Sequence, residues 1–193
     1  MVGERQLSNE PAHLTRDEAA ERLKSLTLAE KGRLKGIAIR FARVIGSGTW
    51  EDLAQEAYSR ALAGSRKWPA GLDVIPFLTG IMRSIASAEW EKKKVTPTLI
   101  TLVGPVGDLA SSSDPLDGDA SPEEALIGKQ LREKLVGLFD GDFDAQIICE
   151  GMLERMEGEA LKELTSLDQV AFDSKRRLVR RKINKAFDEG IVP

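Results

Sequence analysis

Residues 156–187 have the sequence MEGEALKELTSLDQVAFDSKRRLVRRKINKAF, which predicts a short helix, a tight turn and a long basic helix. Apolar residues recur at helical spacing over 159–164, and the turn Ser166-Leu167-Asp168 follows, with Asp168 placed to cap the next helix. That helix is expected to bury one apolar stripe, formed by Phe172, Val179, Ile183 and Phe187. It also carries seven cations: Lys175, Arg176, Arg177, Arg180, Arg181, Lys182 and Lys185.

A short helix, a turn and a basic second helix are typical of a helix-turn-helix, which lays its second helix in the major groove of DNA. The alternative is a basic terminal helix that is merely solvated. A free-standing dimeric repressor is a weaker possibility, because the chain shows no heptad seam for a dimer.

The rest of the chain is also expected to be helical. We predict an all-α protein with two small helical domains, residues 14–95 and 121–189, joined by a flexible linker at 96–120. The linker is rich in Pro, Gly, Ser and Asp, so the two domains are expected to move independently. Helix starts are predicted at capping residues Thr15, Thr27, Thr49, Asp73 and Ser121, and Gly46 can end the second helix.

Composition argues for a binding protein and against an enzyme. The single histidine, His13, and the single cysteine, Cys149, cannot supply a Cys/His zinc site, and no glycine-rich phosphate loop is present. Cys149 lies in an apolar helical context, which favours a core position over a reactive thiol. We therefore expect no catalytic residue, cofactor or metal. We also expect a cytoplasmic protein without a membrane partner, because no apolar run approaches the roughly 20 residues of a membrane span.

The net charge of −3 conceals a strong asymmetry along the chain. Residues 1–94 carry +4, residues 95–121 carry −4, residues 122–168 carry −7, and residues 169–193 carry +4. Because local patches make the contacts to nucleic acid, the acidic total does not exclude DNA binding.

The segment EDLAQEAYSRA, residues 51–61, resembles the D-L-V-Q-E-x-x-x-R-A helix of the small extracytoplasmic-function (ECF) sigma factors of bacterial RNA polymerase. The resemblance covers most of residues 14–94 and 121–187. It implies core RNA polymerase and promoter DNA as partners, with an anti-sigma factor as a further candidate. The residues implied in polymerase binding are Asp52, Leu53, Gln55, Glu56 and Arg60. The alternative is an ordinary amphipathic helix with charge pairs such as Glu56–Arg60.

Residues 66–94, RKWPAGLDVIPFLTGIMRSIASAEWEKKK, resemble the loop and helix with which this family opens and reads the minus-ten promoter element. Ser84 stands where the family usually has Asn, and Glu91 replaces a usual basic residue. Cations and an aromatic face suit single-stranded DNA, whereas a buried structural anchor is the alternative for Trp68 and Trp90. The residues implied in DNA binding here are Arg66, Lys67, Trp68, Arg83, Lys92, Lys93 and Lys94.

The basic helix near the C-terminus resembles the family's T-V-K-S-R-L-x-R-A-R helix, which reads the minus-thirty-five element. In this register Arg176 falls where the family has an apolar residue. The residues implied in DNA binding are Gln169, Ser174, Lys175, Arg177, Arg180 and Arg181. The competing function is a sigma-like interaction protein that binds an anti-sigma factor or another regulator without initiating transcription.

Overall fold

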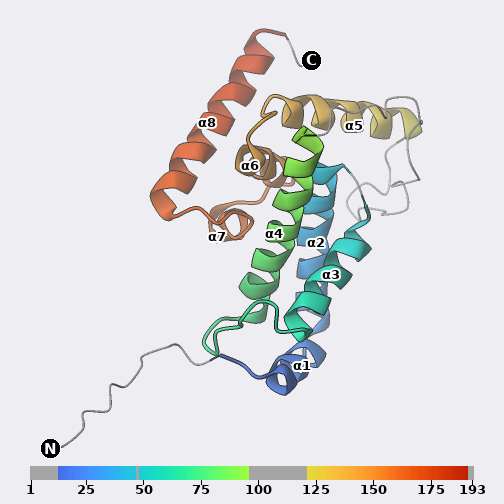
Figure 1. The fold of residues 1–193 in the computed structure, drawn as a ribbon. Helices are drawn as coiled ribbons and strands as arrows, with labels where there is room; N and C mark the ends of the chain where they lie inside the picture. The colour runs from blue at the N-terminus through green and yellow to red at the C-terminus, as the bar shows by residue number, and fades with distance from the viewer. Residues whose placement is uncertain (1–12, 47, 96–120, 191–193) are drawn as a thin grey trace, which may run out of the picture.

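The computed structural model describes residues 13–46, 48–95 and 121–190, and all their regular secondary structure is helical (Figure 1). This confirms the all-α class for the described residues; the 96–120 linker lies outside them. The helices are α1 (Arg16–Lys24), α2 (Leu28–Ile45), α3 (Trp50–Leu62), α4 (Val74–Val95), α5 (Pro122–Gly137), α6 (Phe143–Leu153), α7 (Gly158–Lys162) and α8 (Gln169–Asp188). We call residues 13–95 the N-terminal half and residues 121–190 the C-terminal half.

Local capping signals set most of the helix starts. At Thr15, Thr27, Thr49 and Ser121, the hydroxyl accepts the backbone N–H three residues on, and the carboxylate at that position accepts the capping residue's own N–H. Asp168 accepts the backbone N–H of Ala171 and so begins α8, as predicted. Gly46 ends α2 with φ of 62°, a left-handed conformation that glycine adopts without strain.

Helices α2, α3 and α4 run side by side in the N-terminal half, and α1 crosses their lower end (Figure 1). The apolar spacing of α3 predicts an inner stripe of Leu53, Ala57 and Ala61 with the neighbouring Tyr58 and Leu62. The first three are buried, and Tyr58 and Leu62 are half-buried. Phe41 of α2 and Leu78 of α4 are fully buried beside this stripe in one apolar core.

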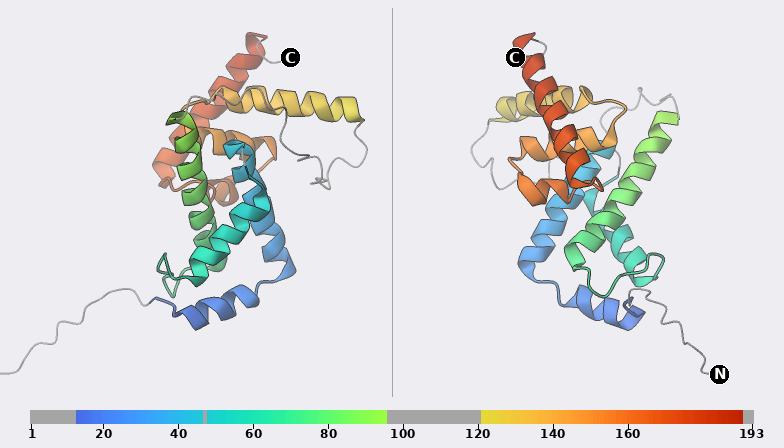
Figure 2. Two further views of the ribbon diagram at one scale, coloured as in Figure 1. Left: turned by 45° about the vertical axis from the view of Figure 1, so that its right-hand side comes forward. Right: turned by 90° about the vertical axis from the view of Figure 1, so that its left-hand side faces the viewer.

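Helix α6 is the centre of the C-terminal half, with nearly every side chain buried. Helix α8 lies on the outside, and the first turns of α5 project away from the body (Figure 2). Phe172 and Val179 of α8 are buried as expected, but Phe187 is 45% exposed and Ala186 takes the buried position instead. The predicted stripe was therefore wrong at its last residue.

The two halves pack against each other through α6. Buried apolar residues from both halves form one continuous cluster among the described residues. Phe143 of α6 stacks on Phe41 of α2 with ring centroids 6.3 Å apart, and Trp90 of α4 donates its indole N–H to Gln146 at 2.8 Å. The structure thus holds the two halves in a docked arrangement.

Replacing Gly151 by alanine should destabilise the fold by about 1–3 kcal/mol, the usual cost of overpacking a core. A Cβ at this position would lie 2.4 Å from Cδ1 of Leu161 and 3.2 Å from Cδ1 of Leu164, both of them buried. Gly128→Ala in α5 is the matched control, since a Cβ there meets nothing within 4 Å and the gain in helix propensity should stabilise by about 0.5–1 kcal/mol. Urea denaturation measures both, and equal effects would contradict the close α6–α7 contact.

Candidate nucleic-acid interface

The outward face of α8 carries three arginines that are free to contact a ligand. Arg177, Arg180 and Arg181 are exposed, and within the described residues none of their side chains forms an ion pair or hydrogen bond. Lys185 extends this face toward the C-terminal end, where it pairs with Glu189 at 3.5 Å. Together these four residues form what we call the α8 cation face, an arrangement suited to phosphate contacts.

The other cations of α8 contact the protein itself. Arg176 lies over the Phe172 ring and pairs with Asp173, and Lys182 donates to the carbonyl of Leu138 at 3.1 Å. Lys175, one of the residues implied in DNA binding, donates to the carboxylate of Asp142 at 2.7 Å. The helix therefore divides its charge between an outward face and an inward, structural face.

The remaining predicted residues at the start of α8 are accessible. Ser174 is exposed, and Gln169 is exposed with its amide donating to Asp173 at 2.9 Å. Val170 was missed by the sequence reasoning; it is 81% exposed and lies one helical turn before Ser174. An exposed β-branched residue at the start of a basic helix is the signal that could have identified it, because an apolar side chain can contact the methyl group of thymine.

Asp142 anchors α6 and Lys175 at once, accepting from the backbone N–H of Ala145 at 3.1 Å and from the Lys175 ammonium. Burial alone would raise the pKa of Asp142, but the bonds from Lys175 and Ala145 outweigh it and lower the pKa. Because the pKa of Asp142 is lowered in the folded protein, its ionised carboxylate stabilises the fold at pH values above the unfolded-state pKa. This stabilisation is lost as the pH falls through the folded-state pKa.

Asp142→Asn should therefore destabilise the protein at pH 7 by about 0.5–1 kcal/mol, because asparagine keeps the cap and loses only the ionic contact with Lys175. The difference from the unsubstituted protein should shrink as the pH falls below about 4, the ordinary pKa of an aspartate, toward the lower folded-state pKa of Asp142. Urea denaturation at pH 7 and pH 3 measures this. Asp188→Asn is the control of equal charge change, since Asp188 is exposed and without an ion pair among the described residues. A pH-independent difference for Asp142→Asn would contradict the ionic role.

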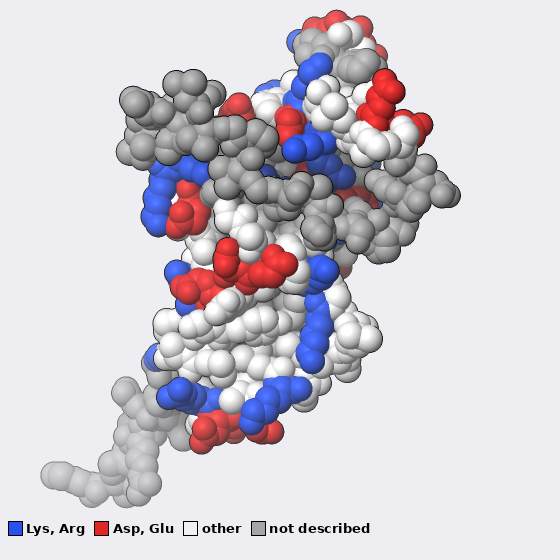
Figure 3. Space-filling view, turned by 90° about the vertical axis from the view of Figure 1, so that its right-hand side faces the viewer, with Lys and Arg blue, Asp and Glu red and all other residues white. Residues whose placement is uncertain are grey.

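The outer face of α3 is open and acidic. Of the residues implied in polymerase binding, Gln55, Glu56 and Arg60 are exposed, whereas Leu53 is buried in the core. Asp52 is exposed, but its carboxylate is engaged in the capping box with Thr49. Figure 3 views the side of the molecule on which α3 lies and shows acidic side chains gathered in a band across it.

The loop before α4 differs from the expected aromatic platform. Trp68 is only 3% exposed, stacks on Phe77 with ring centroids 4.3 Å apart, and donates its indole N–H to the carbonyl of Leu72. In this structure Trp68 is the buried anchor of the alternative interpretation and offers no face to a base. Lys67 is exposed, and Arg66 donates to the carbonyl of Gly80 at 2.9 Å.

The cations of α4 are mostly engaged. Arg83 pairs with Asp144 of α6 at 2.7 Å, and Lys92 pairs with the neighbouring Glu89. Lys93 donates to the carbonyl of Ile45, and burial lowers the pKa of its ammonium. Lys94 lies 3.9 Å from the centroid of the Trp90 ring and donates to the carbonyl of Gly141. The predicted residues of this helix are therefore not presented together on one open surface.

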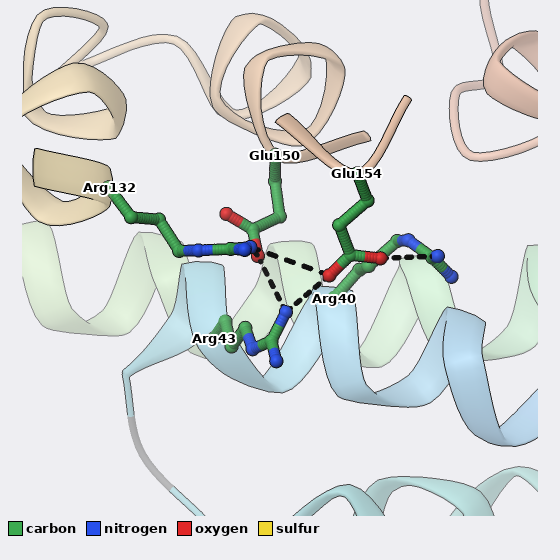
Figure 4. A network of polar contacts seen from close by, with 5 residues as sticks. All are labelled: Arg40, Arg43, Arg132, Glu150 and Glu154. Atoms are coloured by element: carbon green, nitrogen blue, oxygen red, sulfur yellow. Dashed lines mark hydrogen bonds and ion pairs between the residues drawn. The ribbon is translucent and has the colours of Figure 1, made fainter. Parts of the chain in front are cut away.

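A buried ion network that the sequence reasoning missed joins the two halves (Figure 4). Glu150 of α6 is 1% exposed and accepts from Arg132 of α5 at 2.6 Å and from Arg43 of α2 at 3.2 Å. Glu154 pairs with both Arg40 and Arg43 of α2. The only sequence signal for this network was the opposite net charge of residues 1–94 and 122–168.

The described residues include one buried thiol and no cluster of metal ligands. Cys149 is fully buried, as predicted, and burial raises the pKa of its thiol to about 12. Within the described ranges, no three His, Cys, Asp or Glu side chains are grouped to hold a metal ion. None of the described helices combines the length and apolar character needed to cross a membrane.

Comparisons with protein-family models, with curated proteins and with solved structures found no significant match to this chain.

Proposed function

We propose that this protein is an ECF-type sigma factor, which binds core RNA polymerase through α3 and directs it to promoters through α8. The observation that carries the proposal is the α8 cation face, where Arg177, Arg180 and Arg181 are exposed and unpaired within the described residues. Short α7, the turn over residues 163–168 and α8 would act as a helix-turn-helix, with α8 in the major groove.

The acidic outer face of α3 supports the polymerase assignment. Gln55 and Glu56 belong to the segment that resembles the family's polymerase-binding helix, and both are exposed. The rim of a protein–protein interface is polar and accessible to solvent, as these side chains are. The buried stripe of α3 holds the helix in a fixed position against the core.

Gln55→Ala combined with Glu56→Ala should weaken competition for core RNA polymerase by about tenfold, since the proposal places both side chains among the minority of interface residues whose truncation is costly, about 1 kcal/mol or more. Both side chains are exposed, so the double variant should keep its circular dichroism spectrum and melting temperature. Lys24→Ala with Glu21→Ala on α1 is the control, because it removes an exposed ion pair outside residues 51–61. Undiminished competition by a folded variant would show that α3 is not the interface.

The second candidate is a sigma-like interaction protein that does not initiate transcription. It is favoured by the engagement of Arg83 with Asp144 and by the burial of Trp68, which leave few residues of the α4 region open to the minus-ten element. Polymerase-dependent formation of an open promoter complex, followed by footprinting, separates the two candidates. A chain that binds polymerase and opens no promoter would fit the second.

A further inference from the structure

The charges between the two halves are arranged in one direction. Among the described residues, every ion pair that joins the halves has its cation on the N-terminal half and its carboxylate on the C-terminal half. The cations are Arg33, Arg40 and Arg43 of α2 and Arg83 of α4; the carboxylates are Glu150, Glu154, Asp144 and Glu163. Such one-sided pairing makes the C-terminal half an anionic partner for a cationic surface.

This anionic partner covers the region implied in minus-ten recognition. Asp144 holds Arg83, and a cleft of about 740 Å³ separates α4 from α7 and the following turn. On the α4 side the cleft is lined by residues that include Arg66, Arg83 and Glu91, and on the other side by residues that include Glu159, Lys162 and Glu163. A nucleic-acid strand approaching this face of α4 would meet carboxylates in the place where its own phosphates would bind.

We propose that the C-terminal half is an intramolecular electrostatic cover, which nucleic acid must displace before it can bind Arg83 and the neighbouring face of α4. This inference rests on the proposed DNA-binding function. The carboxylates of α6 and phosphates compete for the same guanidinium groups, so binding of DNA and docking of the halves exclude each other. A ligand then binds with an apparent affinity reduced by the fraction of molecules that are open.

The neutral substitutions Asp144→Asn and Glu154→Gln together test the cover, because they keep side-chain shape and remove two of its charges. Glu21→Gln with Glu123→Gln is the matched control, since it changes the net charge equally at two exposed positions that neither join the halves nor line the cleft. Fluorophores on cysteines introduced at the exposed positions Lys31 and Glu133 report the docking of α2 and α5, while the buried Cys149 remains unlabelled.

In the loosened variant, energy transfer between the two labels should fall, and affinity for an oligo(dT) single strand should rise about fivefold or more over the control variant. Addition of Arg83→Ala should abolish that gain. In the protein without these charge substitutions, raised salt or added oligo(dT) should also lower the energy transfer, because both weaken pairing between the halves. This measurement keeps the test decisive if the loosened variant does not fold.

Equal affinity of the loosened and control variants, a gain that survives Arg83→Ala, or energy transfer that oligo(dT) leaves unchanged would each overturn the cover. Those results leave the proposed DNA-binding function intact when the α8 cation face still binds duplex DNA. If the halves separate and no variant binds either single-stranded or duplex DNA, the proposed function fails. The cover fails with it, because there is then no nucleic acid that it keeps from Arg83.

Discussion

Replacing both Arg43 and Arg132 by alanine is expected to destabilise the protein by about 3–5 kcal/mol, the usual consequence of leaving a buried charge without a partner. The buried charge is Glu150, whose side chain is 1% exposed. Its two cationic partners come from opposite halves of the chain, Arg43 from α2 and Arg132 from α5.

The two single substitutions should cost much less, about 1 kcal/mol each, because the remaining arginine still compensates Glu150 and both guanidinium groups are partly exposed. A double-mutant cycle by urea denaturation should therefore give a coupling energy of about 1–3 kcal/mol. Adding Glu150→Gln to the double variant should recover much of the loss, since a neutral amide is far less costly to bury than a charge.

The exposed pair Glu21–Lys24 on α1 is the control cycle, and its two substitutions should be additive. Additive losses for Arg43 and Arg132, or no recovery with Glu150→Gln, would mean that the network in Figure 4 does not govern the docking of the halves.

The helices could be predicted from the sequence because their signals are local. Thr15, Thr27 and Ser121 each stand three residues before a glutamate, and the structure forms the corresponding capping boxes. The stripe of α3 likewise follows from apolar spacing alone. Helix α6 ends at Leu153, and Arg155 adopts a left-handed φ of 58° in the turn toward α7.

The partners of charged side chains could not be predicted in the same way. Arg43 and Glu150 lie 107 residues apart in the sequence, and neither belongs to a motif from which the other could be identified as its partner. The opposite net charges of residues 1–94 and 122–168 indicated that the halves attract each other, but they did not indicate which side chains form the pairs. The same limit applies to Lys175, which the sequence offered as a base contact and which the structure pairs with Asp142 at the start of α6.

Aromatic residues showed a related ambiguity. Trp68 in a basic loop is compatible with base stacking and with burial, and only the tertiary position of Phe77 and Leu72 decides that it is buried here. Phe187 continues the apolar spacing of α8, but Ala186 takes the buried position in that turn, so Phe187 remains partly exposed.

The α8 cation face is expected to contact the phosphates of promoter DNA. Arg177→Ala with Arg180→Ala should lower the affinity of the assembled holoenzyme for promoter DNA by roughly ten- to a hundredfold at about 0.1 M salt. Each lost phosphate contact should also reduce the slope of log affinity against log salt by about 0.9, so the double variant should lose about 1.8.

The chain supplies a matched control on the same helix. Arg176→Ala with Lys182→Ala removes the same charge, but these two cations lie over the rings of Phe172 and Phe139 and face the protein. A general loss of positive charge would weaken DNA binding equally in both double variants, whereas a groove-facing α8 predicts a large effect only for Arg177 and Arg180. Because the control removes contacts of α8 with the protein, its folding must be verified by thermal denaturation.

The α8 cation face can also be distinguished from base recognition by the pattern of loss across promoters. Replacing arginines that contact phosphate should weaken binding to all promoters about equally. Val170→Ala or Ser174→Ala should instead cost about 1–3 kcal/mol of binding free energy when one promoter position is matched, and little when it is changed. If the Arg177 and Arg180 double variant keeps both its affinity and its salt slope, α8 does not enter the groove. The sigma-like interaction protein would then explain the open face of α3 better than a promoter-recognition subunit does.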